Sequence, residues 1–413
     1  MKRNLITNSL LLSLALLSLY WVAGVQALAK TVKPLRPLTA AVTPLTQSET
    51  DFTFIAMGDS RPPLPHMPLP TILRDIMREV TLLRPAFVLY NGDTMWGYGD
   101  TRQELLNELD RFRALANSMG VPLFNAPGNH DMQSDPAAVE IIKEQGQDLY
   151  GSFDVGRYHF IALNTDEVNL ERRITGEQME WLKSDLEMNK MAAGIFVAMH
   201  RPLFSSYRGD FDPEDRDALH ALFRRYHVKA VFAGHDHFYH EEDRDGVHYV
   251  TTAGAGAPLY LQPQSGGFSH YVVVSISANK VDYIVVEPHH LEVTYTAGND
   301  GLEPISTARV MSTLDRNLVA RNLQFHAPRL SSRSLYRITT DLRDEKGQKV
   351  DLPATLRDVV DMHDGSVTVS VEVMVPAGSG FYVTVEAREP AKRLSAHGPK
   401  KGGTLRLRMP SKR

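Results

Sequence analysis

Cysteine is absent from this chain of 413 residues. Its absence excludes disulfide bonds, thiolate ligands for a metal ion and the acylated cysteine of a lipoprotein. The fold must therefore rely on its apolar core, and 43% hydrophobic residues in a chain of this length can form a large one. The length suits two domains better than one.

A strong net charge is missing as well. The formal net charge of −4 is too small to favour nucleic-acid binding, and the 23% of charged residues is ordinary for a soluble globular protein. Basic residues gather only near the C-terminus, where we expect residues 391–413 to form a basic, disordered tail.

The N-terminus has the pattern of an export signal. Lys2 and Arg3 precede an apolar run over residues 10–25, and Ala27-Leu28-Ala29 follows it. A positive start, a short hydrophobic segment and a small-residue site predict a signal peptide over residues 1–29, and hence a periplasmic or secreted protein. The alternative is an uncleaved membrane anchor, since the apolar stretch is nearly long enough to span a bilayer.

Residues 30–50 are rich in proline and threonine and predict an extended linker. Beyond them, strand-like and helix-like runs alternate. The strand-like runs are 52–57, 87–91, 121–126, 195–199 and 228–233, and the helix-like runs are 69–83, 102–119, 175–189 and 214–226. Thr175 and Gln178 fit a capping box at the third helix. This alternation predicts an α/β domain over residues 51–296, with helices covering the faces of buried sheets.

Two further groups of strand-like runs complete the predicted organisation. Runs at 151–153, 158–163, 247–252, 271–276 and 281–286 suggest a second sheet packed on the first. From residue 297 the pattern changes to period-two runs separated by glycine, proline and aspartate turns, which predicts a small all-β accessory domain over residues 297–390.

Five short polar segments each follow an apolar run, at the edge where ligands bind in α/β folds. They are Gly58-Asp59-Ser60-Arg61, Asn91-Gly92-Asp93, Gly128-Asn129-His130-Asp131, Met199-His200-Arg201 and Gly234-His235-Asp236-His237. Each is weak alone, but five in one order are improbable by chance. Their oxygen and imidazole donors suit divalent ions such as Mn, Fe or Zn, without fixing which.

The order of these segments resembles the signature of the calcineurin-like metallophosphoesterases: D-x-H, GD, GNH[DE], a lone histidine and GHxH. The resemblance implies a four-layer α/β/β/α sandwich and hydrolysis of a phosphate mono- or diester by metal-activated hydroxide. It implies that Asp93 bridges two ions, and that His130 protonates the leaving oxygen while Asp131 orients its imidazole. The other implied ligands are Asn129, His200 and His235 on one ion, and Asp59 and His237 on the other.

Arg61 departs from that signature, because it stands where the family has histidine and a guanidinium has no lone pair to donate to a metal. Three interpretations are open. Arg61 could bind the substrate phosphate beside an ion held by Asp59, Asp93 and His237. It could replace the charge of a lost ion in a one-metal site. The site could also have lost activity and bind a phosphorylated ligand. His66 could serve as a substitute ligand, although a solvent-facing histidine is the simpler interpretation.

The sequence therefore predicts an exported metal-dependent phosphoesterase with one or two divalent ions. The alternatives are a weak or inactive phosphate-binding module with one metal, and a cell-envelope interaction protein that acts through its β domain. Trp96 and Tyr98 could wall the site or pack under its loop, and the Tyr207-Arg208 loop could overhang it. Asp166 and Asp185 look like surface charges. Substrate identity and oligomeric state are not determined by these patterns.

Overall fold

The computed structural model describes residues 33–40, 50–99, 101–205, 207 and 211–388. The predicted signal peptide over residues 1–29 and the predicted tail over residues 391–413 lie outside these ranges, as does Arg208. Among the helices of the described ranges, none is both long and apolar enough to cross a membrane.

The first sheet has five strands in the order β11-β10-β1-β2-β3, with β1, β2 and β3 parallel. Its strands are β1 (Asp51–Met57), β2 (Val88–Tyr90), β3 (Leu123–Asn125), β10 (Tyr271–Ser277) and β11 (Lys280–Val286). Both late strands join this sheet because β10 pairs antiparallel with β1. The prediction that runs 271–276 and 281–286 lie in the second sheet is thus wrong, since such long-range pairing leaves no local mark in the sequence.

The second sheet has six strands in the order β4-β5-β6-β7-β9-β8, with β5, β6, β7 and β9 parallel. Its strands are β4 (Gly151–Val155), β5 (Tyr158–Leu163), β6 (Gly194–Met199), β7 (Val228–Ala233), β8 (Tyr239–Arg244) and β9 (Val247–Thr252). Two of the runs first recognised in the α/β alternation, β6 and β7, are therefore at its centre.

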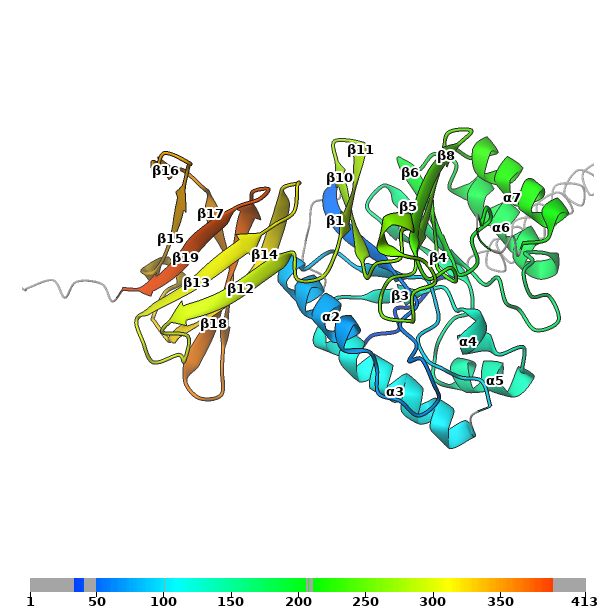
Figure 1. The fold of residues 1–413 in the computed structure, drawn as a ribbon, viewed down its shortest axis with the longest axis horizontal. Helices are drawn as coiled ribbons and strands as arrows, with labels where there is room; N and C mark the ends of the chain where they lie inside the picture. The colour runs from blue at the N-terminus through cyan, green and yellow to red at the C-terminus, as the bar shows by residue number, and fades with distance from the viewer. Residues whose placement is uncertain (1–32, 41–49, 100, 206, 208–210, 389–413) are drawn as a thin grey trace, which may run out of the picture.

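Helices cover the outer faces of the two sheets (Figure 1). The helices are α2 (Thr71–Leu83), α3 (Arg102–Ser118), α4 (Asn129–Met132), α5 (Pro136–Glu144), α6 (Gly176–Met188) and α7 (Pro213–Arg225). The apolar side chains of α2 and α3 pack on the first sheet, and those of α6 and α7 pack on the second. The predicted four-layer α/β/β/α sandwich is confirmed.

Strand β1 shows how the alternation of side chains builds these layers. Phe52 and Phe54 point into the core between the two sheets, whereas Ile55 and Met57 belong to the core under α2 and α3. Phe54 stacks on Phe87 with ring centroids 5.1 Å apart. Because both faces of β1 are buried, its position relative to α2 and α3 on one side and to the second sheet on the other is fixed.

The ends of the helices follow their sequences in most cases. Thr101 and Glu104 form a capping box at α3, and the Asp212 side chain caps α7. The predicted capping box at α6 is wrong, because Thr175 makes no side-chain cap there. Gln178 instead exchanges hydrogen bonds of 2.8 and 2.9 Å with the backbone of Asn164, which holds the loop after β5.

The chain continues into a β-rich region made of two packed sheets, in the orders β12-β13-β19-β15-β16 and β14-β18-β17. Its elements are β12 (Leu291–Ala297), β13 (Ile305–Ser312), β14 (Leu318–Pro328), the 3-10 turn Arg333–Leu335, β15 (Tyr336–Arg343), β16 (Lys349–Val350), β17 (Ala354–Asp361), β18 (Ser366–Val375) and β19 (Gly380–Ala387). Strand β12 begins at Leu291 and pairs with β13, so this sheet begins six residues before the boundary that the sequence suggests.

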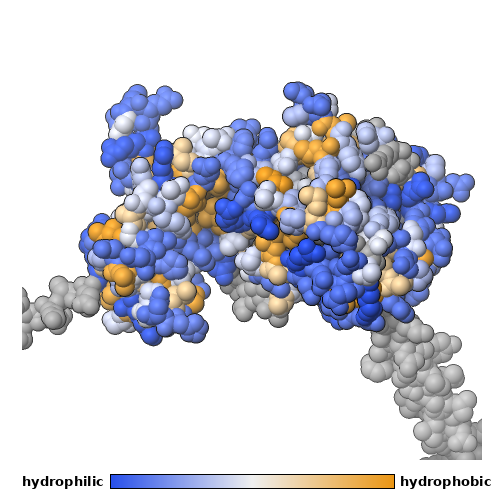
Figure 2. Space-filling model, turned by 60° about the horizontal axis from the view of Figure 1, so that its bottom comes forward, coloured by the Kyte–Doolittle hydropathy of each residue, from blue (hydrophilic) through white to orange (hydrophobic). Residues whose placement is uncertain are grey.

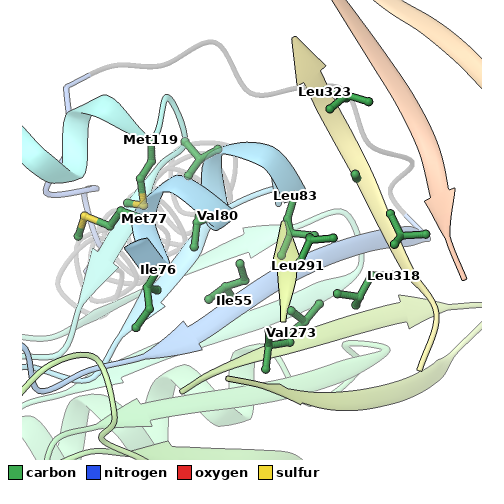
Figure 3. Close-up of a cluster of buried hydrophobic side chains, with 14 of the residues drawn as sticks. Ile55, Ile76, Met77, Val80, Leu83, Met119, Val273, Leu291, Leu318 and Leu323 are labelled. Carbon is green, nitrogen blue, oxygen red and sulfur yellow. The ribbon is translucent and has the colours of Figure 1, made fainter. Parts of the chain in front are cut away.

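The two halves share one apolar cluster. Leu83 of α2, Val273 of β10 and Leu318 of β14 belong to it, and Figure 3 shows them on neighbouring elements with Leu291. Asn322 adds a hydrogen bond of 3.1 Å to the carbonyl oxygen of Thr81. The β-rich region is therefore docked on α2 rather than tethered.

On the face shown in Figure 2, hydrophobic side chains appear as small patches within a largely hydrophilic surface.

Residues 33–40 fall in the predicted linker but pack against the α/β domain. Leu35 is buried, and its amide donates to the carbonyl oxygen of Ser152 at 2.9 Å. Leu38 similarly donates to the carbonyl oxygen of Leu123 at 2.7 Å. This part of the predicted linker is therefore bound along β3 and β4, because its leucine side chain and backbone donors find partners there.

Candidate metal centre

The five polar segments meet at one edge of the sandwich, beyond the carboxyl ends of β1, β2, β3, β6 and β7. Backbone hydrogen bonds join them: the amide of Asp59 donates to the carbonyl oxygen of Gly92 at 3.0 Å, and that of Gly234 to the carbonyl oxygen of His200 at 2.8 Å. The packing of the two sheets therefore brings together loops that are far apart in sequence.

One group of donors consists of Asp59, Asp93 and His237. Their ligand atoms lie within 4.8 Å of one another, and all three residues are buried. Nδ1 of His237 lies 2.6 Å from the carbonyl oxygen of Pro258, so the proton on that nitrogen leaves the Nε2 lone pair directed at Asp59 Oδ1, 3.4 Å away. The sequence predicts these same three residues as the ligands of an ion beside Arg61, which cannot itself bind a metal.

A second group surrounds the side-chain oxygen of Asn129. Asn129 Oδ1 lies 2.9 Å from His235 Nδ1 and 3.0 Å from His200 Nε2. His200 Nε2 is also 3.4 Å from Asp93 Oδ1, while its Nδ1 faces the carbonyl oxygen of Asn91 at 2.7 Å. Asp93 is therefore adjacent to both groups, in the position expected of a bridging ligand.

The electrostatics of these groups fit a cation. Asp59 is fully buried, and this burial, together with the nearby charge of Asp93, raises the pKa of Asp59 well above its ordinary value. Burial also acts against ionisation of Asp93, but the positive charges of His200 and His130 hold the pKa of Asp93 below its ordinary value. Two adjacent buried carboxylates need positive charge for stability, and divalent ions supply it.

The backbone at the centre is strained where the donors need it. Asp59, Asp93 and His235 have φ values of 63°, 56° and 68°, in the left-handed region that non-glycine residues seldom adopt. Strain of this kind persists at functional sites when the surrounding structure holds it. The backbone thus supports a functional role for these three residues.

Two glycines allow the loops to approach one another. A Cβ atom on Gly128 would lie 2.3 Å from Asp93 Oδ1, and one on Gly234 would lie 2.2 Å from Asp59 Oδ2. Any side chain at either position would therefore displace a donor. This explains why glycine precedes the donor segments in the GNHD and GHDH motifs.

The structure corrects the expected role of Asp131. Its carboxylate accepts hydrogen bonds from the amides of Gly128, Asp93 and Thr94, at 2.8, 2.9 and 3.0 Å. Asp131 lies in the first turn of α4, and its side chain turns back toward these buried amides. The prediction that it orients His130 is wrong, because the His130 Nδ1 atom contacts the carbonyl oxygen of Trp96.

His130 lies beside the donors. Its backbone amide donates to Asp93 Oδ1 at 3.0 Å, and the residue is 9% exposed. Burial lowers the pKa of His130 below its ordinary value, with the Arg61 charge adding to that effect. Since a carbonyl oxygen only accepts, Nδ1 carries the proton toward Trp96 and Nε2 is left for proton transfer.

Arg61 lies beside Asp93, at the side of the centre. Its Nε lies 3.9 Å from Asp93 Oδ2, its guanidinium lies over the Trp96 ring at 5.3 Å, and its side chain is 12% exposed. Within the described part of the chain, that Nε has no hydrogen-bond acceptor. His66 is not a substitute ligand here, because its side chain is 60% exposed and lies 3.6 Å from Glu104.

Asp166 and Arg201 extend the centre beyond the predicted residues. Arg201 Nη1 lies 3.0 Å from His235 Nε2, while its Nε donates to Asp166 Oδ1 at 2.7 Å. Asp166 is buried, so its interpretation as a surface charge is wrong. It follows β5 as the other polar segments follow their strands, and that position could have identified it. Asp185 is also buried, bonded to His159 at 2.8 Å.

Aromatic rings stand beside both groups of donors. The Tyr98 hydroxyl accepts a hydrogen bond of 3.1 Å from the amide nitrogen of Asn129, and its ring meets that of His130 at 4.7 Å. Tyr260 stacks on His237 with centroids 4.2 Å apart. Sequence reasoning named Tyr98 but missed Tyr260, which lies in an irregular loop without a motif.

The fold and this convergence of donors define an α/β/β/α protein with a candidate metal site. A family model described as calcineurin-like phosphoesterase matches residues 66–239. The chain therefore carries a domain of the calcineurin-like phosphoesterase family. The match includes the segments of Asp93, Asn129, His200 and His235, and it begins after Asp59 and Arg61.

Individual relatives cover only parts of this chain. Purple acid phosphatase 21 of Arabidopsis thaliana is 29% identical over 189 residues, which are 41% of this chain and 41% of that protein. Probable inactive purple acid phosphatase 9 of the same plant is 33% identical over 191 residues, or 44% and 28%. A dimetal phosphatase structure from Danio rerio has 15% identity and a TM-score of 0.44, covering 57% of this chain and 99% of that one. The chain spans less than half the length of these two plant relatives.

Proposed function

We propose that this protein is a metal-dependent phosphoesterase that hydrolyses a phosphate mono- or diester. The observation that carries the proposal is the position of Asp93 between two donor groups, one with Asp59 and His237 and the other with Asn129, His200 and His235. Two bound divalent ions there would polarise the phosphoryl group and make a water nucleophilic near neutral pH.

The surrounding residues have roles that follow from their contacts. Arg61 holds a phosphate oxygen, because its charged side chain lies beside Asp93 and its Nε has no acceptor among the described residues. His130 in its protonated form gives the Nε2 proton to the leaving oxygen, and its lowered pKa makes it ready to release that proton. Asp131 keeps the loop of Asp93 in place.

The geometry favours the two-metal interpretation of Arg61 over the one-metal interpretation. Asp59, Asp93 and His237 form a complete three-ligand group without any contribution from residue 61. An arginine that replaced an ion would occupy the space among these three residues. Its guanidinium lies instead over Trp96, at the side of the centre.

A phosphate-binding module with little or no turnover is the competing function. Arg61 and the likeness to a relative named as probably inactive are the two observations in its favour. Such a module would bind inorganic phosphate and would not release it from an ester. Measuring both properties on one metal-loaded preparation separates the two functions.

Export is part of the proposal, and its support is the N-terminal pattern of Lys2, Arg3 and the apolar run that precedes Ala29. Expression of the full chain with a cleavage assay tests it. A mature N-terminus at Lys30 in the exported fraction supports export, and an intact N-terminus in the membrane fraction supports an anchor.

Alanine substitutions test the catalytic proposal. His235→Ala and His130→Ala should each reduce hydrolysis of p-nitrophenyl phosphate by at least about a hundredfold. His363→Ala, at an exposed position of the β-rich region, is the matched control and should retain the wild-type rate. Wild-type rates in both site variants would contradict the proposed function.

A further inference from the structure

Each group of donors has its own tyrosine. On the Asn129 side, Tyr98 reaches the amide nitrogen of Asn129 with its hydroxyl, yet the residue is 40% exposed. On the other side, the Tyr260 hydroxyl lies 3.5 Å from Nε2 of His237. The two rings therefore approach the centre through different predicted ligands.

The tyrosine on the His237 side belongs to a longer stack. The Tyr260 ring is 18° from parallel to the His237 ring, and the Tyr207 ring follows at 5.7 Å and 20°. Tyr207 is 49% exposed, so an aromatic surface continues from the predicted ligand to the solvent.

On the Tyr98 side, aromatic rings lie around His130. Trp96 and Tyr98 both contact the His130 ring, at 5.4 and 4.7 Å, and Arg61 lies over Trp96. His130 is the proposed donor to the leaving oxygen, so these rings line the space that the leaving group enters. A ring that served only the core would be buried, whereas Tyr98 is not.

We infer that the leaving group of the substrate carries a planar aromatic ring, and that Tyr98 and Tyr207 select it by stacking. This inference rests on the proposed function and specifies its substrate class. Aromatic side chains stack on planar rings without requiring a particular hydrogen-bond pattern. A simple sugar phosphate or phosphoserine offers no such face.

Two substrates with the same ester isolate this effect. Adenosine 5′-monophosphate and ribose 5-phosphate both release a primary sugar alcohol, and they differ chiefly in the planar base. The wild-type protein should show a kcat/KM at least about tenfold higher for the nucleotide. If only p-nitrophenyl phosphate is turned over, competitive inhibition constants for the two compounds give the same ratio.

Matched variants test whether the rings of Tyr98 and Tyr207 cause this ratio of kcat/KM values. Tyr207→Leu and Tyr98→Leu should bring the ratio close to one, whereas Tyr98→Phe, which keeps the ring, should preserve it. Tyr382→Leu, at a 43% exposed tyrosine of β19, is the control and should leave the ratio unchanged.

The outcomes distinguish the two claims. A ratio near one in the wild-type protein, with both compounds hydrolysed, would overturn the inference and leave the phosphoesterase intact. A preserved ratio in both leucine variants would also overturn it. Absence of hydrolysis for every ester would instead overturn the proposed function, and the inference with it.

Discussion

Arg61 Nε lies 3.9 Å from Asp93 Oδ2, so a permanent positive charge stands beside the carboxylate that adjoins both groups of donors. The distance is longer than a hydrogen bond, and this nitrogen has no acceptor among the described residues. This arrangement suits a side chain that donates a hydrogen bond to an anionic substrate when one binds.

Replacing Arg61 by glutamine should therefore weaken substrate binding more than metal binding. We expect KM for p-nitrophenyl phosphate to rise by about ten- to a hundredfold, since a charge-assisted contact to phosphate is lost. Metal content by elemental analysis should stay unchanged. Arg316→Gln, at an exposed position, is the control.

Replacing Arg61 by histidine distinguishes the interpretations further. The imidazole restores the ligand that the family signature has at this position, so metal content should rise or metal preference should change. An unchanged metal stoichiometry and preference would count against binding of an ion beside residue 61.

Asp131→Ala should act on the loop rather than on the imidazole of His130. Losing the carboxylate leaves the buried amides of Asp93 and Thr94 without their acceptor, at a cost of about 1–3 kcal/mol for each. The midpoint of urea unfolding should therefore fall, together with metal content. A variant with wild-type stability and metal content but a lower kcat would support the orienting role instead.

His270 should make the protein less stable in acid. Burial lowers the pKa of His270 to about 4, while the unfolded chain has the ordinary value of 6.5. Between these pH values His270 binds a proton in the unfolded state but not in the folded state. The free energy of unfolding therefore falls by up to about 3 kcal/mol as the pH drops from 6.5 to 4. Urea unfolding of His270→Gln should show a shallower pH dependence across this window, and an unchanged slope would contradict the account.

His159 should have the opposite effect. Despite its burial, the carboxylates of Asp185 and Asp154, at 2.8 and 2.7 Å, raise the pKa of His159 above its ordinary value. Its contribution to stability is complete below pH 6.5 and is lost as the pH rises through the folded-state value. Asp185→Asn should therefore destabilise the protein more at pH 6 than at pH 9. An equal loss at both pH values would show that His159 is not charged.

The sequence predicts the layers of the fold and the donor residues better than it predicts which strands pair and which groups a side chain contacts. The buried runs and their polar ends locate Asp59, Asp93, Asn129, His200, His235 and His237, because short-range patterns mark a strand and the loop after it. Pairing of β10 with β1 is not visible in this way, since it joins residues more than two hundred positions apart. The direction of a side chain is not visible in the sequence either, since only the structure of α4 shows that Asp131 faces backbone amides.

The docking of the β-rich region illustrates the same limit. Leu83 and Leu318 both read as core residues of their own elements, yet they share one cluster across the junction of the two halves. Apolar patterns indicate that a face is buried without indicating what covers it.

Metal removal and return, followed by an ester-hydrolysis assay, tests the central claim most directly. The protein is treated with a chelator, dialysed, and assayed with p-nitrophenyl phosphate and its bis ester before and after addition of Mn²⁺, Fe²⁺ or Zn²⁺, with bound metal determined in parallel. The account predicts no turnover without metal and recovery as about two ions bind per chain. Turnover that is equal with and without metal, or absent in a fully metal-loaded and folded protein, would contradict it.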